Sequence, residues 1–290
     1  MNAPALPDNT RLTQVHLRVA NLAGMLPFYQ KALGLVVVRQ TNGQVVLDTS
    51  EKGPGFLHLT EDPQAVPHPR LATGLYHFAI LYPTRAELAH ALKRLILQNW
   101  AIDGASNHLV SEAIYLRDPE NNGIELYVDV PRSQWKWRDG QVEMATESLD
   151  LQELLATDGT EPAPQHPAAA TQLGHIHLHV PDLRQAELFF HELLGFAVTQ
   201  RSYPGALFLS AGGYHHHIGA NTWAGKASPP PNSTGLISYR FEIPDAGALA
   251  AIEGRAPALG FEVVKAESAE GREVLSLKDP SASWFEIALG

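Results

Sequence analysis

Histidine is the residue type in this chain with the most chemistry to offer. The 290 residues include 14 His and no Cys. Because no thiolate is available, a bound transition metal would be held by His nitrogens and carboxylate oxygens. The lack of Cys also excludes disulfides, iron–sulfur clusters and a Cys nucleophile. A metal site built from His, Asp and Glu is therefore the first hypothesis.

The segment GHIHLHV (Gly174–Val180) carries three of these His residues at alternate positions. If the segment is a β-strand, His175, His177 and His179 share one face, because strand side chains alternate with a period of two. One of them could bind a metal while the other two line the same cavity. The alternative is that His177 and His179 are hydrogen-bonded residues of a barrel wall.

The segment YHHHIG (Tyr214–Gly219) carries three adjacent His residues. In a strand, His215 and His217 would share one face and His216 would point to the other. The preceding Gly-Gly pair and the strand-like context favour the edge of a cavity. A solvated surface run is the alternative.

Motifs for several other chemistries are missing from the sequence. The chain has no GxxxxGK[ST] segment, no GxGxxG after a predicted strand and no GxSxG elbow. His191-Glu192 is followed by Leu193-Leu194-Gly195, so HExxH is missing too. The sequence therefore gives no support to a P-loop, a dinucleotide site, a nucleophilic serine or a zinc site of the HExxH kind.

The chain is acidic, with 31 Asp and Glu against 21 Lys and Arg and a formal net charge of -10. This balance disfavours binding to a nucleic-acid backbone or to an anionic membrane. The N-terminal residues lack the basic stretch and apolar run of a signal peptide, and no apolar run approaches the ~20 residues that cross a bilayer. We expect a cytoplasmic protein that binds neither nucleic acid nor membrane.

Two distant parts of the chain repeat each other at a single offset. Val15–Val37 and Ile176–Val198 lie 161 residues apart and are identical at 8 of 23 positions. The same offset relates Ala113–Val128 to Val274–Leu289, with Leu, Asp, Pro and Glu at matching places. One offset at both ends indicates a duplicated half with few insertions.

Each half divides into two repeats of the form βαβββ. In the first repeat, the alternating strand TQVHLRV precedes a helix over Leu22–Leu33 that ends at Gly34, and three short strands follow. The second repeat has a helix over Arg85–Gln98 and ends with the strand Gly123–Val128. The third and fourth repeats follow the same plan.

The repeats predict two domains joined by a linker. The first half spans residues 11–129 and the second half spans residues 172–290. Residues 130–171 are polar and end in a stretch rich in Ala and Pro, which is typical of an interdomain linker. Trp135 and Trp137 in this segment either anchor the linker on a domain surface or form a flap over a ligand pocket.

Four stretches of the sequence, in register along most of the chain, carry a family resemblance. With the tandem repeats, they resemble the vicinal oxygen chelate superfamily, which includes glyoxalase I, bleomycin-resistance proteins and extradiol ring-cleaving dioxygenases. Within it, the chain is similar to the catechol-2,3-dioxygenases of the bacterial CatE type. The stretches are GLYHFAIL (Gly74–Leu81), SEAIYLRDPENNGIELYVD (Ser111–Asp129), GHIHLHVPDL (Gly174–Leu183) and SAGGYHHHIGANTWAG (Ser210–Gly225).

The resemblance implies an α+β fold in which βαβββ repeats pair and curl their strands into an open barrel. Four tandem repeats would then form two such barrel domains. It also implies a metal in the mouth of a barrel, held from the first and last strands of each repeat. Taken repeat by repeat, those positions hold Gln14 and His58, His77 and Glu125, His175 and His217, and Ser238 and Glu286.

Two pairings of the repeats stay open at this point. Pairing the second repeat with the third, and the first with the fourth, gathers His77, Glu125, His175 and His217 in one site. Pairing neighbours would divide these residues between two barrels and make Glu286 a candidate ligand. We favour the first pairing, because it brings the strongest metal ligands together once. The role of His58 stays open under both.

The predicted function is that of a non-haem iron(II) extradiol dioxygenase, which opens a catechol-like ring with O2. Two His and one carboxylate are common iron(II) ligands in oxygen-activating enzymes and leave positions open for substrate and O2. Fe(II) is the expected cofactor, with Mn, Ni or Zn as alternatives. His217, and after it His215, is the candidate base for a substrate proton. The expected partners are a small aromatic diol and O2, and a homo-oligomer is compatible with the sequence.

Two other functions remain as alternatives. A glyoxalase-type lyase or isomerase with Ni2+ or Zn2+ would need four protein ligands with Glu carboxylates as metal-bound bases, which three His and one Glu match less well. A drug-binding protein on the same scaffold would need aromatic cavity walls and no metal. Metal analysis of the purified protein separates this last alternative from the two enzymes.

Overall fold

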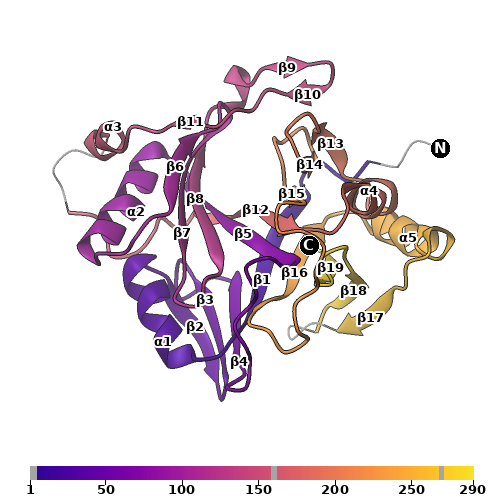
Figure 1. Cartoon of the computed structure of the whole chain (residues 1–290), viewed down its shortest axis with the longest axis horizontal. Helices are drawn as coiled ribbons and strands as arrows, with labels where there is room; N and C mark the ends of the chain where they lie inside the picture. The colour runs from indigo at the N-terminus through magenta and orange to yellow at the C-terminus, as the bar shows by residue number, and fades with distance from the viewer. Residues whose placement is uncertain (1–4, 158–161, 268–270) are drawn as a thin grey trace. The chain divides into compact units, whose positions relative to one another are not determined.

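Four βαβββ repeats follow one another along the chain, which confirms the predicted α+β architecture. The computed structural model describes residues 5–157, 162–267 and 271–290 (Figure 1). Residues 158–161 of the predicted linker lie outside the described residues. The chain divides into two compact units, which we call the N-terminal unit (Leu17–Pro67 and His77–Gly174) and the C-terminal unit (Met1–His16, His68–Tyr76 and His175–Gly290).

The first repeat contains a strand, a helix with a π-helical last turn, and three further strands. The helix begins at Asn21, whose side chain accepts a hydrogen bond from the amide of Gly24. It ends before Gly34, whose φ of 75° suits a residue without a side chain, as predicted. The elements are β1 (Arg11–Val19), α1 (Leu22–Pro27), η1 (Phe28–Ala32), β2 (Val36–Thr41), β3 (Gln44–Asp48) and β4 (Leu57–Glu61).

The second repeat has the longest helix of the described chain. This helix begins at Thr84, whose hydroxyl accepts a hydrogen bond from the amide of Glu87. The elements are β5 (Gly74–Leu81), α2 (Arg85–Leu97), β6 (Gly104–Asn107), β7 (Ser111–Arg117) and β8 (Gly123–Asp129).

The segment after the second repeat contains short elements. Trp135 is buried, and its indole N–H donates to the carbonyl of Val130, whereas Trp137 is 45% exposed. Trp135 therefore fixes this segment to its own unit. The elements are η2 (Arg132–Gln134), β9 (Trp137–Arg138), β10 (Gln141–Val142), β11 (Glu147–Ser148) and α3 (Leu151–Ala156).

The third and fourth repeats follow the same plan. The elements of the third are β12 (Gln172–His179), α4 (Leu183–Glu187), η3 (Leu188–Leu193), β13 (Ala197–Gln200), β14 (Ala206–Ser210) and β15 (Ile218–Asn221). Those of the fourth are β16 (Gly235–Ile243), α5 (Ala246–Arg255), η4 (Pro257–Leu259), β17 (Val264–Glu267), β18 (Glu273–Lys278) and β19 (Trp284–Leu289).

In the described residues, the strands form two large sheets and one small one. The strand order is β17-β18-β19-β16-β1-β4-β3-β2 in the eight-stranded sheet and β11-β6-β7-β8-β5-β12-β15-β14-β13 in the nine-stranded sheet, and β9 pairs with β10. This order follows the pairing of the second repeat with the third and of the fourth with the first, which we favoured over the pairing of neighbours.

The strands of the second repeat have two different faces. Alternate residues such as Phe78, Ile80 and Leu126 are fully buried on one face, and α2 packs against the sheet formed by β6, β7 and β8 (Figure 1). The opposite face carries His77 and Glu125. The helix thus covers one face of the sheet, and the other face holds His77 and Glu125 beside the buried residues Ala79, Ala113 and Tyr127.

None of the helices in the described residues is long and apolar enough to span a membrane.

Candidate metal centre

His77 and Glu125 form a buried pair on neighbouring strands. β5 and β8 run parallel, with Ala79 opposite Glu125, so His77 lies two residues before that position on the same face. Nε2 of His77 is 3.0 Å from Oε2 of Glu125. The two residues are only 5% and 3% exposed. A buried carboxylate is stable in such a place only if a cation, a metal or hydrogen-bond donors compensate its charge.

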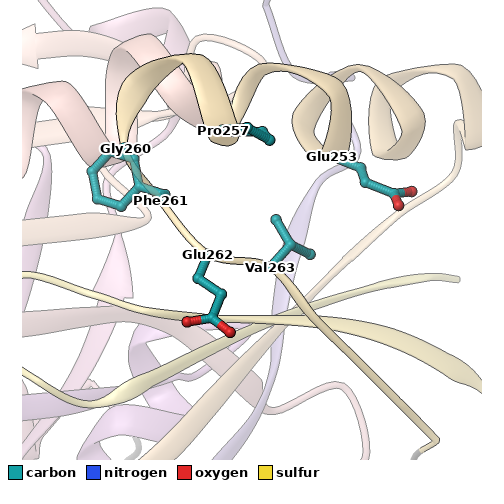
Figure 2. A pocket seen from close by; sticks show the side chains of 6 residues that line it. All are labelled: Glu253, Pro257, Gly260, Phe261, Glu262 and Val263. Atoms are coloured by element: carbon teal, nitrogen blue, oxygen red, sulfur yellow. The ribbon is translucent and has the colours of Figure 1, made fainter.

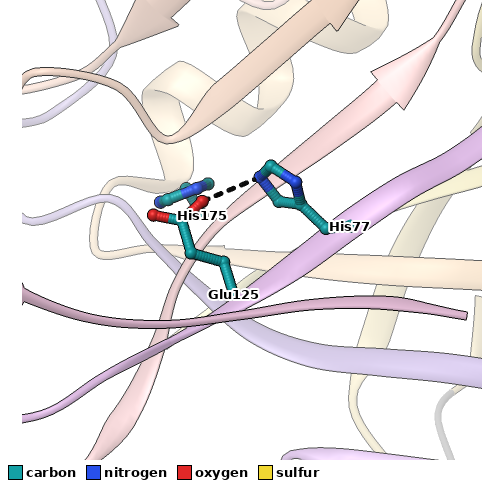
Figure 3. A group of neighbouring side chains, drawn as sticks. All are labelled: His77, Glu125 and His175. Carbon is teal, nitrogen blue, oxygen red and sulfur yellow. Dashed lines mark ion pairs between the residues drawn. The ribbon is translucent and has the colours of Figure 1, made fainter. Parts of the chain in front are cut away.

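His175 on β12 completes a group of three. The ligand atoms of His77, Glu125 and His175 all lie within 4.8 Å of one another (Figure 3). The structure thus brings together three of the four metal ligands expected from the sequence.

The donor set of this group fits a divalent transition metal. Two ligands on adjacent corners of an octahedral ion, each about 2.1 Å from it, are roughly 3.0 Å apart, which is the separation of the His77 nitrogen and the Glu125 oxygen. Two imidazoles and one carboxylate are the donor set of mononuclear iron(II) oxygenases. Hard-cation sites for Ca2+ or Mg2+ use oxygen ligands instead.

His217, the expected fourth ligand and base, lies in a different environment. Its ring packs near Tyr214, Phe196 and Phe241, with ring centroids 4.8, 6.5 and 6.4 Å away. Its Nδ1 accepts a hydrogen bond from the amide of Ala211. His217 is thus part of the aromatic packing of the C-terminal unit and is not in the group of three.

His216 lies beside His175, where the sequence had predicted His217. The ring centroids of His175 and His216 are 4.2 Å apart, and Nδ1 of His216 is 2.7 Å from Nδ1 of His215. The reason is local, because β15 begins only at Ile218 and the three His residues precede it in irregular structure. The strand alternation assumed for this segment is therefore wrong. His215 is fully buried and lies behind His216, with its ring centroid 6.2 Å from that of His175.

Tyr115 and His108 are a polar pair beside the site that the sequence did not indicate. Tyr115 lies directly opposite Glu125 in the β7–β8 register, and its ring is 5.6 Å from that of His77. The carbonyl of Ala145 is 2.7 Å from Nδ1 of His108, so this nitrogen is the donor. The phenol of Tyr115, 2.6 Å from Nε2 of His108, therefore donates to that nitrogen when the ring is neutral. The one signal in the sequence is the spacing: Tyr115 lies two residues after Ala113 on the same strand, so both side chains lie on the same face.

His177 and His179, whose roles were open, are both held by Asn221. Oδ1 of Asn221 accepts from the amide of Trp223 and is 2.6 Å from Nδ1 of His179. The amide nitrogen of Asn221 must then be the donor to Nε2 of His177, at 3.0 Å. These hydrogen bonds are those expected in the alternative in which the two His belong to a wall.

Gly174, next to His175, is required by close packing. A Cβ at this position would lie 1.7 Å from the phenol oxygen of Tyr127, whose side chain is fully buried on β8. Only glycine therefore lets β12 begin beside this ring. The contact connects the backbone at a candidate metal ligand to the strand that carries Glu125.

The corresponding positions of the fourth repeat hold a different arrangement. Glu286 lies opposite Arg240 in the β16–β19 register, and its Oε2 accepts from Nε and Nη2 of Arg240 at 2.9 and 2.8 Å. His58, on β4, has its Nε2 3.2 Å from the carbonyl of Gly55. Ser238 and Gln14 are buried polar residues on β16 and β1. Glu286 thus has a fixed guanidinium as its partner.

The turns before β8 and β19 are shaped by buried aspartates. Asp118 accepts hydrogen bonds from the amides of Glu120 and Asn122 and from the phenol of Tyr29 at 2.7 Å. Burial raises the pKa of Asp118 to about 6, although these hydrogen bonds act in the opposite direction. Burial likewise raises the pKa of Asp279, which accepts from Tyr239. Both aspartates therefore fix the shape of a turn.

A hollow beside the end of α5 has no comparable chemistry (Figure 2). One of its two carboxylates, Glu253, forms an ion pair with Lys265 at 2.8 Å. The ring of Phe261 packs against Phe189, with centroids 5.3 Å apart. The residues that line the hollow are Glu253, Pro257, Gly260, Phe261, Glu262 and Val263.

Comparisons with known proteins agree with this fold. A protein of Bacillus subtilis (strain 168) named catechol-2,3-dioxygenase is 42% identical over 282 residues, which cover 95% of this chain and 96% of that protein. A crystal structure from Bacillus subtilis subsp. subtilis str. 168 has a TM-score of 0.67 at 13% identity and covers 99% of this chain and 86% of its own. Glyoxalase I from Zea mays has a TM-score of 0.60 at 14% identity, with 97% and 92% covered.

At such low identities, the two structural likenesses concern the fold alone, and they confirm the predicted curled, open sheets. The model of the Glyoxalase/Bleomycin resistance protein/Dioxygenase superfamily matches residues 11–126 and 172–287, which is most of both halves. With this match and the 42% identity to a full-length relative, the chain belongs to that superfamily.

Proposed function

We propose that this protein is a non-haem iron(II) extradiol dioxygenase that opens the ring of a catechol-like substrate with O2. The observation that carries the proposal is the group of His77, Glu125 and His175, all buried and with ligand atoms within 4.8 Å of one another. The similarity to a protein named catechol-2,3-dioxygenase supports the same reaction class.

In this proposal, His77, Glu125 and His175 hold the metal. An iron(II) ion held there would supply binding sites for the diol oxygens and for O2 and would allow electron transfer from the ring to O2. Three protein ligands on an ion that takes six would leave room for these two molecules. The carboxylate of Glu125 offsets part of the charge of a divalent cation in a buried site.

His216 is the residue that we assign to proton transfer. Its ring is next to His175, and its Nδ1 is hydrogen-bonded to Nδ1 of His215, so we assign Nε2 to the exchange of a proton with a substrate hydroxyl. The buried ring of His215 holds this orientation, because a shared proton between the two nitrogens fixes the tautomer. An imidazole titrates near neutral pH and suits a general base. We assign His217 no role in the reaction.

Tyr115 provides a second polar group beside the site. Its hydrogen bond to His108 fixes the phenol near the position opposite Glu125. Because its one O–H is donated to His108, the phenol oxygen can accept a hydrogen bond from a substrate hydroxyl.

The test is anaerobic reconstitution of the purified protein with Fe(II), followed by catechol and then oxygen. The proposal expects one iron per chain and a yellow ring-opened product. A drug-binding protein would retain no iron, and a glyoxalase-type enzyme would bind a metal without consuming O2. In the described residues, three ligands come together where that second alternative needs four. Oxygen uptake that does not depend on Fe(II) would also contradict the proposal.

A further inference from the structure

Two neighbouring imidazoles meet in the loop between β14 and β15. This loop spans residues 211–217, and we call it the three-histidine loop. Nδ1 of His215 is 2.7 Å from Nδ1 of His216, and the ring centroids are 4.6 Å apart. In an extended chain, consecutive side chains point to opposite faces. The contact therefore requires a turned backbone at the peptide bond between the two residues, and the orientation of that peptide bond determines where the His216 ring lies.

Thr199 on β13 donates a hydrogen bond to this peptide bond. Its Oγ1 is 2.6 Å from the carbonyl oxygen of His215, which belongs to the peptide bond that joins His215 to His216. The same Oγ1 is 3.2 Å from the carbonyl oxygen of Phe208. Because a hydroxyl has one proton to donate, we assign the proton to the nearer carbonyl. The hydrogen bond is buried, since Thr199 is 3% exposed and His215 is fully buried.

Thr199 is the extra residue of a β-bulge. In the register of β13 with β14, Val198 lies opposite Leu209 and Gln200 lies opposite Phe208, so the register passes over Thr199. A bulge bends its strand and redirects a side chain, and bulges are frequent beside active sites. The bulge thus gives the Thr199 hydroxyl a direction that a regularly paired residue would not have.

Other hydrogen bonds hold the three-histidine loop at different places. Oγ of Ser210 donates to the carbonyl of Tyr214 at 2.6 Å. The amide of Ala211 donates to Nδ1 of His217 at 3.2 Å. Of these three hydrogen bonds, only the one from Thr199 reaches the peptide bond between the two imidazoles that meet. Loss of the Thr199 hydroxyl should therefore act on that peptide bond first.

We infer that Thr199 is a positioning residue, which holds the backbone so that the His216 ring stays against both His215 and the candidate metal ligand His175. The ring centroid of His216 is 4.6 Å from that of His215 and 4.2 Å from that of His175. This inference rests on the proposed function, because it takes His216 to transfer a proton during the reaction. A displacement of about 1 Å lowers such a rate by about 100-fold. Thr199 is not in the group of three, so iron should still bind.

The first experiment measures turnover of catechol by the iron(II)-loaded protein. Thr199→Val removes the hydroxyl and keeps the branched shape. It is expected to lower kcat by about 10–100-fold, with stoichiometric iron and with KM within about 3-fold of the wild type. Thr199→Ser keeps the hydroxyl and should keep kcat within about 3-fold.

A double-mutant cycle with His216→Asn tests whether Thr199 acts through His216. In that background, Thr199→Val should change kcat by less than about 2-fold, because the base is already gone. A purely structural role of Thr199 would lower kcat by the same factor in both backgrounds, and this result would overturn the inference.

Ser210→Ala is the matched control, because it removes a buried hydroxyl that is also 2.6 Å from a carbonyl of the same loop. It should leave kcat within about 3-fold, and a loss as large as that of Thr199→Val would overturn the assignment to Thr199. If Thr199→Val does not fold, Thr199→Ser is compared with Thr199→Ala, since these two differ only in the hydroxyl. Equal kcat values for this pair would also overturn the inference.

NMR of the metal-free protein separates this inference from the proposed function. With isotope-labelled histidine, the proton between the two Nδ1 atoms of His215 and His216 gives a downfield signal that couples to both nitrogens. The signal is expected in the wild type and in Thr199→Ser, and it should be lost in Thr199→Val. If ring opening is wrong and the inference is right, this pattern appears although no yellow product forms. A signal that persists in Thr199→Val, or that is missing from the wild type, overturns the inference even if the wild type opens the ring.

Discussion

Replacement of Glu125 by Gln should separate metal binding from folding. The carboxylate is 3% exposed and 3.0 Å from His77, so an isosteric amide changes its charge and basicity but little of its packing. Partners that only orient a metal ligand are worth about 10–100-fold in metal affinity. A directly bound carboxylate should therefore be worth at least about 100-fold.

This loss can be measured as stabilisation by metal. A ligand at 100 times its dissociation constant stabilises the folded state by about 2.7 kcal/mol. At the same Fe(II) concentration, a variant that binds 100-fold more weakly gains only about 0.4 kcal/mol. For a chain of this size, the first value corresponds to a rise in Tm of about 5–10 °C and the second to about 1 °C. Thermal unfolding without oxygen, with and without Fe(II), gives both shifts.

Glu286→Gln is the matched control, since Glu286 lies at the corresponding position of the fourth repeat and pairs with Arg240. Loss of that pair lowers the Tm of the metal-free protein, but the rise caused by Fe(II) should stay that of the wild type. The reasoning is refuted if both variants lose the same part of the Fe(II)-dependent shift. It is also refuted if Glu125→Gln keeps the full shift.

Four further variants test other parts of the structure. His216→Asn should keep stoichiometric iron while turnover falls by about 10²–10⁴-fold. His217→Asn should leave turnover within about 3-fold, and the reverse result would restore His217 as the base. Gly174→Ala should weaken metal binding, because its methyl group displaces the ring of Tyr127; an unchanged Fe(II) titration would show that the contact is easily relieved. Asp118 has a folded-state pKa of about 6, above the ~3.9 of an unfolded chain, so the folded state binds more protons between these values. The free energy of unfolding should therefore fall as pH rises from 4 to 6, by on the order of 2 kcal/mol from this group. In Asp118→Asn that part of the slope should vanish, and parallel curves from chemical denaturation would contradict the assignment.

The repeats and most helices could be predicted because their signals are local. A helix that ends at Gly34 and an offset of 161 residues between the halves are both readable from the sequence. His77, Glu125 and His175 were found because each lies on a regular strand of a repeat whose family pattern places ligands there. The prediction depended on regular structure around each residue.

The same reasoning does not extend to the three adjacent His residues, because they lie between the end of β14 at Ser210 and the start of β15 at Ile218. Gly212 and Gly213 both have positive φ angles, 61° and 63°, and a Cβ on Gly212 would lie 2.4 Å from the carbonyl of Asp8. The chain therefore turns sharply after β14, and strand alternation cannot be extended across the three His residues. Tyr115 was missed for another reason, because its partner His108 is oriented by a carbonyl that is distant in sequence, that of Ala145.

The duplicated halves also explain why we expect one metal centre instead of two. At the offset of 161 residues, His77 corresponds to Ser238 and Glu125 corresponds to Glu286. The decisive position is the residue opposite the carboxylate in the parallel strand pair, which is Ala79 in the second repeat and Arg240 in the fourth. The methyl group of Ala79 leaves the carboxylate to His77, whereas the guanidinium of Arg240 takes up Glu286 with two hydrogen bonds. A fixed cation at the carboxylate removes the charge that would attract a metal ion, and repulsion between the two cations adds to this. The corresponding glutamates can therefore differ in role, as a metal ligand in the first half of the chain and as the partner of an arginine in the second. The difference comes from one position on the neighbouring strand, Ala79 or Arg240.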